Sequence, residues 1–143
     1  MDDVRLFGYL QPPTLELSTY ASTLYERRMT AVVVPRKMIE IHGWRPEPNE
    51  CHANASTCAA VDPRVTAVRG WLICEYPGAV YLRFTAHSVI ELDDGELVDI
   101  TPVPPLIWKY PFLRANVPDS EFHAISDALI SAHGYAHLDH LLK

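Results

Sequence analysis

The chain has 143 residues, of which 48% are hydrophobic, and this suffices for one compact domain with a sizeable core. The formal net charge is -6 and lysine and arginine form no runs, which argues against binding to a nucleic-acid phosphate backbone. Apolar runs such as 31–34 and 71–74 are well below the length of a membrane span. We therefore expect a single domain over residues 1–143, with neither a nucleic acid nor a membrane as partner.

The numbers of cysteines and prolines give further information on the cellular environment and on the kind of fold. Three cysteines are an odd number and do not make a disulfide framework, and the acidic opening Met1-Asp2-Asp3 carries no secretory signal. These features predict a reduced, cytoplasmic protein. Twelve prolines against six glycines indicate many short elements with rigid connections. We expect no cofactor, and the composition leaves the oligomeric state open.

The first half of the chain predicts two helices separated by short extended segments. In chain order we expect an extended arm (1–13), a helix (14–29), two short strands (30–34 and 38–41) and a proline-rich loop (42–48). Thr14 is a suitable cap for the first helix. Asn49 is expected to cap the second helix, in which Cys51, Ala55 and Cys58 share one face, and Asp62-Pro63 ends it.

The second half of the chain is rich in β-branched and aromatic residues and predicts an antiparallel sheet. Strands are expected over 65–75, 79–91 and 96–101, followed by an aromatic lid over 106–118 that contains Trp108, Tyr110 and Phe112. A final helix capped by Asp119 or Ser120 should end at Gly134, with one or two helical turns over 135–143. This order of elements predicts an α+β fold, an antiparallel sheet packed against helices.

The segment 93–95 joins two predicted strands, and its conformation decides which side chains share a face. A two-residue turn would place Asp99 opposite Ile90, as an unpaired carboxylate in the core, which is costly. A three-residue loop with Gly95 in the left-handed conformation places Asp99 on the other face. His87 and Asp99 are then diagonal neighbours, roughly 7 Å apart at the backbone and within side-chain reach.

Cys51, His87 and Asp99 together have the residue types of a catalytic triad. A cysteine nucleophile needs its thiolate form, which the first turn of a helix favours through its free N–H groups and macrodipole. The nucleophile also needs a base, and the base needs a third group that holds its tautomer. We therefore predict Cys51 as nucleophile, His87 as general base and Asp99 as the residue that orients it.

The pattern around these residues resembles the transglutaminase-like and papain-like cysteine enzymes. The resemblance covers residues 49–102 and consists of four motifs: Glu50-Cys51-His52, Gly70-Trp71, Ala86-His87-Ser88-Val89 and Gly95-Glu96-Leu97-Val98-Asp99-Ile100-Thr101-Pro102. It implies a nucleophile on a helix packed against an antiparallel sheet, with the histidine on one strand and the aspartate on the next. It also implies acyl transfer from a protein, peptide or other amide or ester substrate, as a hydrolase, deamidase or transglutaminase. Ser88 and Val89 depart from the aromatic residue that commonly follows the histidine in that superfamily.

Two further residues are candidates for substrate contacts. Trp44 lies in the loop before the second helix and could wall a cleft, whereas Trp71 is most simply a core residue beside Gly70, which permits a close backbone approach. Asn49 could donate its side-chain amide to an oxyanion instead of capping the helix. The backbone N–H of Cys51 is the safer oxyanion donor.

Two other functions compete with the enzyme hypothesis. The first is a non-catalytic binding module that presents the aromatic stretch over 108–112 to a partner. The second, weaker one is a small metal-binding protein, because Cys51-His52 with His42 and His87, or the set His133, His137 and His140, supplies ligand types that metals use. The first set has no Cys-x-x-Cys or His-Glu-x-x-His spacing. The three histidines of the second set have helical spacings of four and three and could share one face, but Gly134 lies within that run and weakens the helix, so a solvated tail is expected and no metal is predicted.

Overall fold

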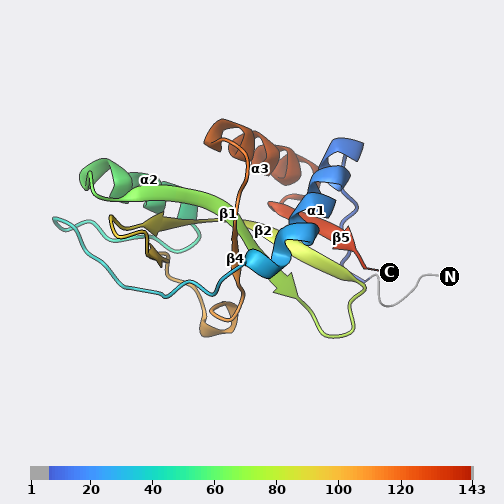
Figure 1. The fold of residues 1–143 in the computed structure, drawn as a ribbon, viewed down its shortest axis with the longest axis horizontal. Coiled ribbons are helices and arrows are strands. Elements are labelled where there is room, and N and C mark those ends of the chain that lie inside the picture. Colours follow the sequence, from blue (N-terminus) through green and yellow to red (C-terminus); the bar gives the residue numbers. More distant parts are fainter. Residues whose placement is uncertain (1–6, 143) are drawn as a thin grey trace.

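The computed structural model describes residues 7–142 as an α+β fold, a curled antiparallel sheet packed against three helices (Figure 1). The helices are α1 (Leu15–Arg27), α2 (Cys51–Val61) and α3 (Asp119–His133), with short 3₁₀ turns η2 (Arg28–Thr30) and η3 (Pro105–Ile107). The strands are β1 (Thr66–Glu75), β2 (Tyr81–Glu91), β3 (Leu97–Val98), β4 (Phe112–Arg114) and β5 (His137–Leu141). Their order is β3-β2-β1-β4, and β5 pairs with the other end of β2. None of the helices in this part of the chain is long and apolar enough to span a bilayer.

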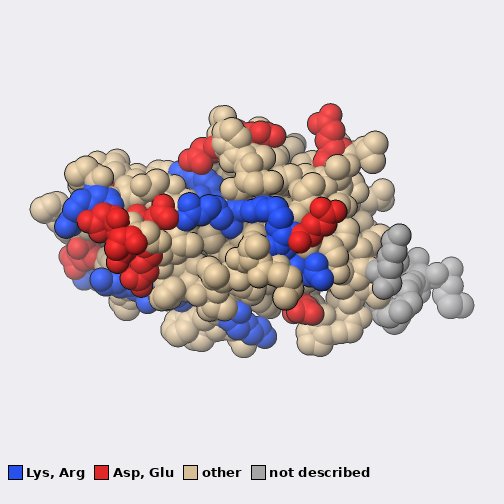
Figure 2. All heavy atoms as spheres, viewed as in Figure 1, with Lys and Arg blue, Asp and Glu red and all other residues tan. Residues whose placement is uncertain are grey.

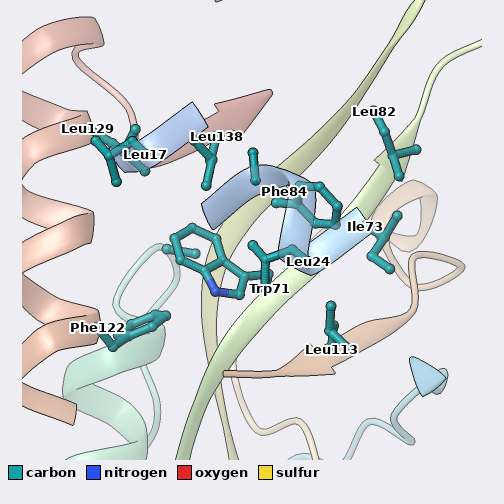
Figure 3. Packing of buried hydrophobic residues seen from close by; sticks show 12 residues of the cluster. Leu17, Leu24, Trp71, Ile73, Leu82, Phe84, Leu113, Phe122, Leu129 and Leu138 are labelled. Carbon is teal, nitrogen blue, oxygen red and sulfur yellow. The ribbon is translucent and has the colours of Figure 1, made fainter. Parts of the chain in front are cut away.

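The long β1–β2 hairpin forms the centre of the sheet, and its position confirms the two predicted strands. Its register runs from Thr66 opposite Glu91 to Glu75 opposite Leu82. Since side chains alternate along a strand, one face of the hairpin carries the main core. Figure 3 shows that core, in which Trp71, fully buried as predicted, packs among side chains from the sheet, α1 and α3. Its members include Leu17, Leu24, Phe84, Leu113, Phe122, Leu129 and Leu138.

The β2–β3 hairpin adopts the predicted register. Gly95 has φ 88° and its N–H donates to the carbonyl of Leu92 at 2.9 Å, which closes a three-residue loop. The N–H of Leu92 in turn donates to the carbonyl of Glu96 at 2.9 Å, and Ile90 pairs with Val98. The apolar side chains of this hairpin, which include Ile90 and Val98, therefore face α2. The side chain of Asp99, the next residue, lies on the opposite face of the hairpin.

The predicted strand over 96–101 is only partly correct, because β3 ends at Val98. The backbone of Asp99 leaves β2 and pairs with residues 35–37 instead. Its N–H donates to the carbonyl of Pro35 at 2.8 Å, and its carbonyl accepts from the N–H of Lys37 at 3.0 Å. This parallel bridge to Arg36 fixes the segment around residue 36 against the edge of the sheet.

The strands predicted over 30–34 and 38–41 are wrong. Each segment forms only an isolated bridge, Val32 with Phe112 and Ile41 with Trp44. Their β-branched residues have the local propensity, but Pro35 cannot donate a ladder hydrogen bond and no long partner strand lies beside them. The lid prediction over 106–118 holds in part, since Phe112 enters β4 and is buried, while Trp108 is half exposed.

The helix ends also differ from the predicted ones. Thr14 caps α1 as expected, with its hydroxyl accepting from the N–H of Leu17 at 3.1 Å. Asn49 does not cap α2: it takes a left-handed conformation with φ 62°, and the helix begins after Glu50. Similarly, α3 begins at Asp119 itself, after Pro118, without a side-chain cap.

The predicted helical turns over 135–143 are wrong as well. Gly134 ends α3 with φ 80°, as expected, but the chain then runs along β2 as β5. Leu138 is buried in the main core, and Asp139 is buried in an ion pair with Arg83 at 2.8 Å. The predicted arm over 1–13 lies partly outside the described residues, and within the remainder the N–H of Leu10 donates to Asp139 at 2.9 Å.

Charged side chains are unevenly distributed over the surface. Figure 2 shows acidic side chains gathered at the left end of the molecule, with basic side chains beside them and in a narrow band across the middle of this face. No broad basic surface is visible on this face, as expected from a net charge of -6.

Gly70 provides a test of the sheet packing. A Cβ atom at this position would lie 2.3 Å from the carbonyl oxygen of Leu113 and 2.5 Å from the ring of Phe112. We expect Gly70→Ala to lower the free energy of unfolding by roughly 1–3 kcal/mol, because the β1–β4 pairing must move apart. Urea denaturation measures this loss. An unfolding free energy of Gly70→Ala equal to that of the parent protein would contradict the packing.

Candidate active site

Helix α2 holds Cys51 at its first residue, beside the sheet. The helix lies over the β2–β3 hairpin through Ala55 and Cys58, which are buried against Ile90 and Val98. This apolar contact follows from the predicted helix face and hairpin register. The N–H groups in the first turn of a helix have no intrahelical acceptor, so the start of α2 offers free donors around the Cys51 thiol.

His87 and Asp99 form a buried, hydrogen-bonded pair. The distance between His87 Nε2 and Asp99 Oδ2 is 2.7 Å, and the two side chains are only 6% and 3% exposed. The other carboxylate oxygen of Asp99 accepts from the N–H of Thr101 at 3.2 Å. Arg36 Nη2 lies 3.1 Å from Asp99 Oδ2. The buried carboxylate is therefore fully paired, which removes the cost of burying it alone.

The Cys51 thiol lies against two imidazoles, those of His52 and His87. Its Sγ is 3.7 Å from His52 Nδ1, and it also interacts with His87. Burial raises the pKa of the thiol, but hydrogen bonding and positive charge from the two histidines outweigh burial and lower the pKa to about 6. A thiol with this pKa is mostly thiolate at neutral pH.

The pKa of His87 shifts in the opposite direction. Burial lowers it, but the hydrogen bonds and negative charges of Asp99 and Cys51 outweigh burial and raise the pKa to about 9. Between pH 6 and pH 9 the favoured state of the site is thus a Cys51 thiolate beside a His87 imidazolium. The two groups titrate as a coupled pair, so these values belong to the pair.

His52 is the closer histidine to the thiol, but its ring nitrogen is already engaged by a hydroxyl. The Nδ1 atom of His52 is 2.5 Å from the hydroxyl of Ser88, a much shorter contact than its 3.7 Å distance from the thiol. Ser88 therefore competes with the thiol for this nitrogen. Among the described residues, the His87 ring bonds to Asp99 through Nε2, and its Nδ1 has no hydroxyl competitor of this kind.

A buried arginine connects the helix that carries Cys51 to the sheet. Arg69 of β1 donates to the carbonyl of His52 at 3.0 Å, to the hydroxyl of Ser56 at 2.6 Å and to the hydroxyl of Ser88 at 3.0 Å. Its side chain is nearly inaccessible, and it also pairs with Asp119 of α3 at 3.4 Å. The sequence analysis missed this network. The signal that could have revealed it is the arginine within an otherwise apolar strand, since a buried guanidinium requires several hydrogen-bond acceptors.

Asn54 is a second residue that the sequence analysis missed. It is 3% exposed, and its amide accepts from the N–H of Glu47 at 3.0 Å and donates to the carbonyl of Glu47 at 2.8 Å. Its Nδ2 also donates to the hydroxyl of Thr101 at 3.0 Å. The side chain of Asn54 thus connects the loop before Cys51 with the segment after Asp99 through hydrogen bonds.

The other predicted site residues lie apart from this cluster. Trp44 packs partly buried against the Ala55 and Ile90 cluster, and Asn49 is exposed in its left-handed turn. Both residues thus belong to the structure of the loop that precedes α2. No contact of Asn49 with Cys51 is found within residues 7–142.

The candidate metal ligands are not brought together. No group of three or more His, Cys, Asp or Glu residues within the described part of the chain has the geometry to hold a metal ion. His133 ends α3, whereas His137 and His140 lie on β5, so these three do not share a helical face. The ring of His137 stacks on Tyr135, and that of His140 stacks on Tyr25.

No known protein family, curated protein or solved structure matches this chain. The geometry of Cys51, His87 and Asp99 is therefore the basis for a functional hypothesis.

The role of Asp99 can be tested by the titration of His87. We expect Asp99→Asn to lower the pKa of His87 from about 9, because the substitution removes the negative charge that stabilises the imidazolium. NMR chemical shifts of the imidazole against pH measure this change. Glu91→Gln is the control, since this carboxylate pairs with Arg114 at the surface and should leave the His87 titration unchanged. An identical His87 titration in Asp99→Asn and the parent protein would contradict the pairing.

Proposed function

We propose that the protein is a cysteine-dependent acyl-transfer enzyme in which Cys51 is the nucleophile, His87 the general acid and base, and Asp99 the residue that orients His87. The observation that carries this proposal is the buried hydrogen bond between His87 and Asp99 at 2.7 Å, together with the charge of His87, which lowers the pKa of the Cys51 thiol. Asp99 engages the Nε2 of His87, which leaves Nδ1 as the atom we assign to proton exchange with the thiol in a nucleophile–base–orienting group arrangement.

The arrangement of the elements supports a transglutaminase-like or papain-like core. Cys51 opens a helix that packs against an antiparallel sheet, His87 lies on β2, and Asp99 directly follows β3. The order of the residues is the one that the motif resemblance implies, with Asp99 one residue beyond the strand instead of on it. We infer an amide or ester substrate, with a protein or peptide as the preferred partner class.

The proposed reaction begins with the thiolate–imidazolium pair. The Cys51 sulfur attacks the carbonyl carbon of the substrate, a C–S bond forms, and the carbonyl oxygen becomes an oxyanion. The backbone N–H of Cys51, free at the start of α2, is the donor we assign to this oxyanion. His87 then gives its proton to the leaving nitrogen or oxygen, whose bond to the carbonyl carbon breaks, and a thioester remains on Cys51.

The second half of the proposed reaction restores the enzyme. Neutral His87 takes a proton from water or an amine, which attacks the thioester carbonyl. The C–S bond breaks, the acid or amide product leaves, and the thiolate–imidazolium pair forms again. Asp99 orients His87 and stabilises the imidazolium at both steps.

The reactivity of Cys51 tests the first part of this proposal. We expect iodoacetamide to alkylate Cys51 with a rate that rises through about pH 6, because the pKa of the thiol is lowered to that value. In His87→Ala the midpoint should move upward, toward the ordinary cysteine value of about 8.5. Intact-mass measurement across pH identifies the modified protein.

Two variants control this experiment. Cys58→Ala and Cys74→Ala should leave the profile unchanged, since both thiols are buried and burial raises the pKa of each. In contrast, Cys51→Ala should remove the low-pH alkylation while the protein stays folded. An alkylation midpoint that is the same in the parent and in His87→Ala would exclude His87 as the partner and favour a non-catalytic binding module.

Turnover of an activated ester tests the complete triad. With p-nitrophenyl acetate we expect a bell-shaped rate, which rises through about pH 6 as Cys51 loses its proton and falls through about pH 9 as His87 loses its own. An acetyl group should be found on Cys51 by mass spectrometry. Asp99→Asn should retain alkylation but lower turnover by roughly 10²–10⁴-fold. Equal turnover in Asp99→Asn and the parent would leave at most a Cys–His dyad.

A further inference from the structure

A cavity of about 440 Å³ lies next to the proposed triad, with Asp99 among the residues that line it. Its volume falls within the range of small-molecule sites, roughly 300–1,000 Å³. Four parts of the chain line it, namely 36–39, 45–46, 99–103 and Trp108. Neither Cys51 nor His87 lines this cavity, so it adjoins the site proposed above and shares only Asp99 with it.

The walls of the cavity are held in place by backbone pairing. The bridge between Arg36 and Asp99 and the hydrogen bond from the N–H of Lys37 to the carbonyl of Asp99, 3.0 Å, connect its two sides. Trp108 is fixed by its indole N–H, which donates to the carbonyl of Val103 at 3.1 Å. The cavity is therefore formed without a ligand, as is usual for small-molecule sites.

Apolar side chains on the cavity wall are left open to water. Trp108 is 50% exposed and Met38 is 97% exposed, although both are large hydrophobic residues. Ile39, Pro102 and Val103 add to this apolar lining. Exposed aromatic and aliphatic surface within a cavity is typical of sites that bind an apolar group.

The charges of the cavity are positive in a protein whose net charge is -6. Arg36, Lys37 and Arg45 line it, and Asp99 is its one carboxylate. The carboxylate of Asp99 is already paired with His87 and Arg36, and Arg45 shares an exposed pair with Glu40 at 3.2 Å. Among the described residues Lys37 forms no ion pair, so a cationic group remains for a ligand.

We propose that this cavity binds a small organic anion with an aromatic or branched apolar body. The apolar body lies against Trp108 and Met38, and the anionic group lies at the rim beside Lys37 and Arg45. The guanidinium of Arg36, with its carbon 6.0 Å from the centre of the Trp108 ring, connects the aromatic wall with the cationic rim. This site does not depend on the proposed catalytic function.

Two fluorescent probes test the proposal, 8-anilinonaphthalene-1-sulfonate and its uncharged analogue N-phenyl-1-naphthylamine. They share an aromatic body and differ in the sulfonate. We expect one tight site for the sulfonated probe on the full chain, and weaker binding of the neutral probe. Trp108→Ala should weaken both probes, by roughly tenfold if the ring contributes as buried aromatic contacts do. Trp108→Phe should restore part of the affinity.

Charge variants complete the test. The double variant Lys37→Ala with Arg45→Ala should weaken the sulfonated probe by roughly threefold or more and leave the neutral probe unchanged. Lys109→Ala is the matched control, because this cation lines a different cavity, beside Tyr110. The proposal would be overturned if Trp108→Ala left the affinity for the probes unchanged or if Lys109→Ala lowered it. It would also be overturned if the two probes bound the parent protein equally well. The same titration on Cys51→Ala separates this result from the proposed catalysis, since the probe should bind that variant equally well.

Discussion

The buried carboxylate of Asp99 is the group on which the geometry of the site depends. It accepts from His87 at 2.7 Å and from the N–H of Thr101, and it pairs with Arg36. A carboxylate in this position is stable only when every partner is present, because an uncompensated buried charge is strongly destabilising. The same group therefore fixes three parts of the molecule: the imidazole on β2, the segment after β3 and the extended chain around Arg36. Asp99 thus belongs both to the proposed active site and to the cavity next to it.

The parts of the structure that follow from local rules could be predicted from the sequence. A strand has a side-chain period of two, so the choice of a three-residue loop at Gly95 decided which face holds Asp99, and the structure has that register. The same argument placed His87 beside it. Helix α2 was predicted because a polar start, a short apolar face and a proline stop are all local signals. Turn chemistry and periodicity were thus enough for the hairpins and for two of the three proposed catalytic residues.

The parts that depend on distant partners could not be predicted in this way. β5 joins β2 across more than fifty residues, and its sequence fits a strand only once that open edge is known to exist. Local propensity likewise predicted one strand over residues 96–101, whereas in the structure β3 ends at Val98 and Asp99 pairs with residues 35–37. His52, Ser88 and Arg69 meet only because α2 lies across the sheet at one particular angle. Such side-chain networks have no periodic signature, and a buried charge within an apolar strand is their one visible sign.

Arg69 gives the molecule a scaffold whose charge is constant while its site titrates. A guanidinium stays protonated at every pH at which a protein is folded, and the partners that Arg69 holds on α2 and β2 are a carbonyl and two hydroxyls, which do not titrate in that range. These hydrogen bonds of Arg69 between the helix and the sheet therefore do not involve the groups that change charge at the site. Cys51 and His87 exchange protons beside a connection that neither of their side chains takes part in.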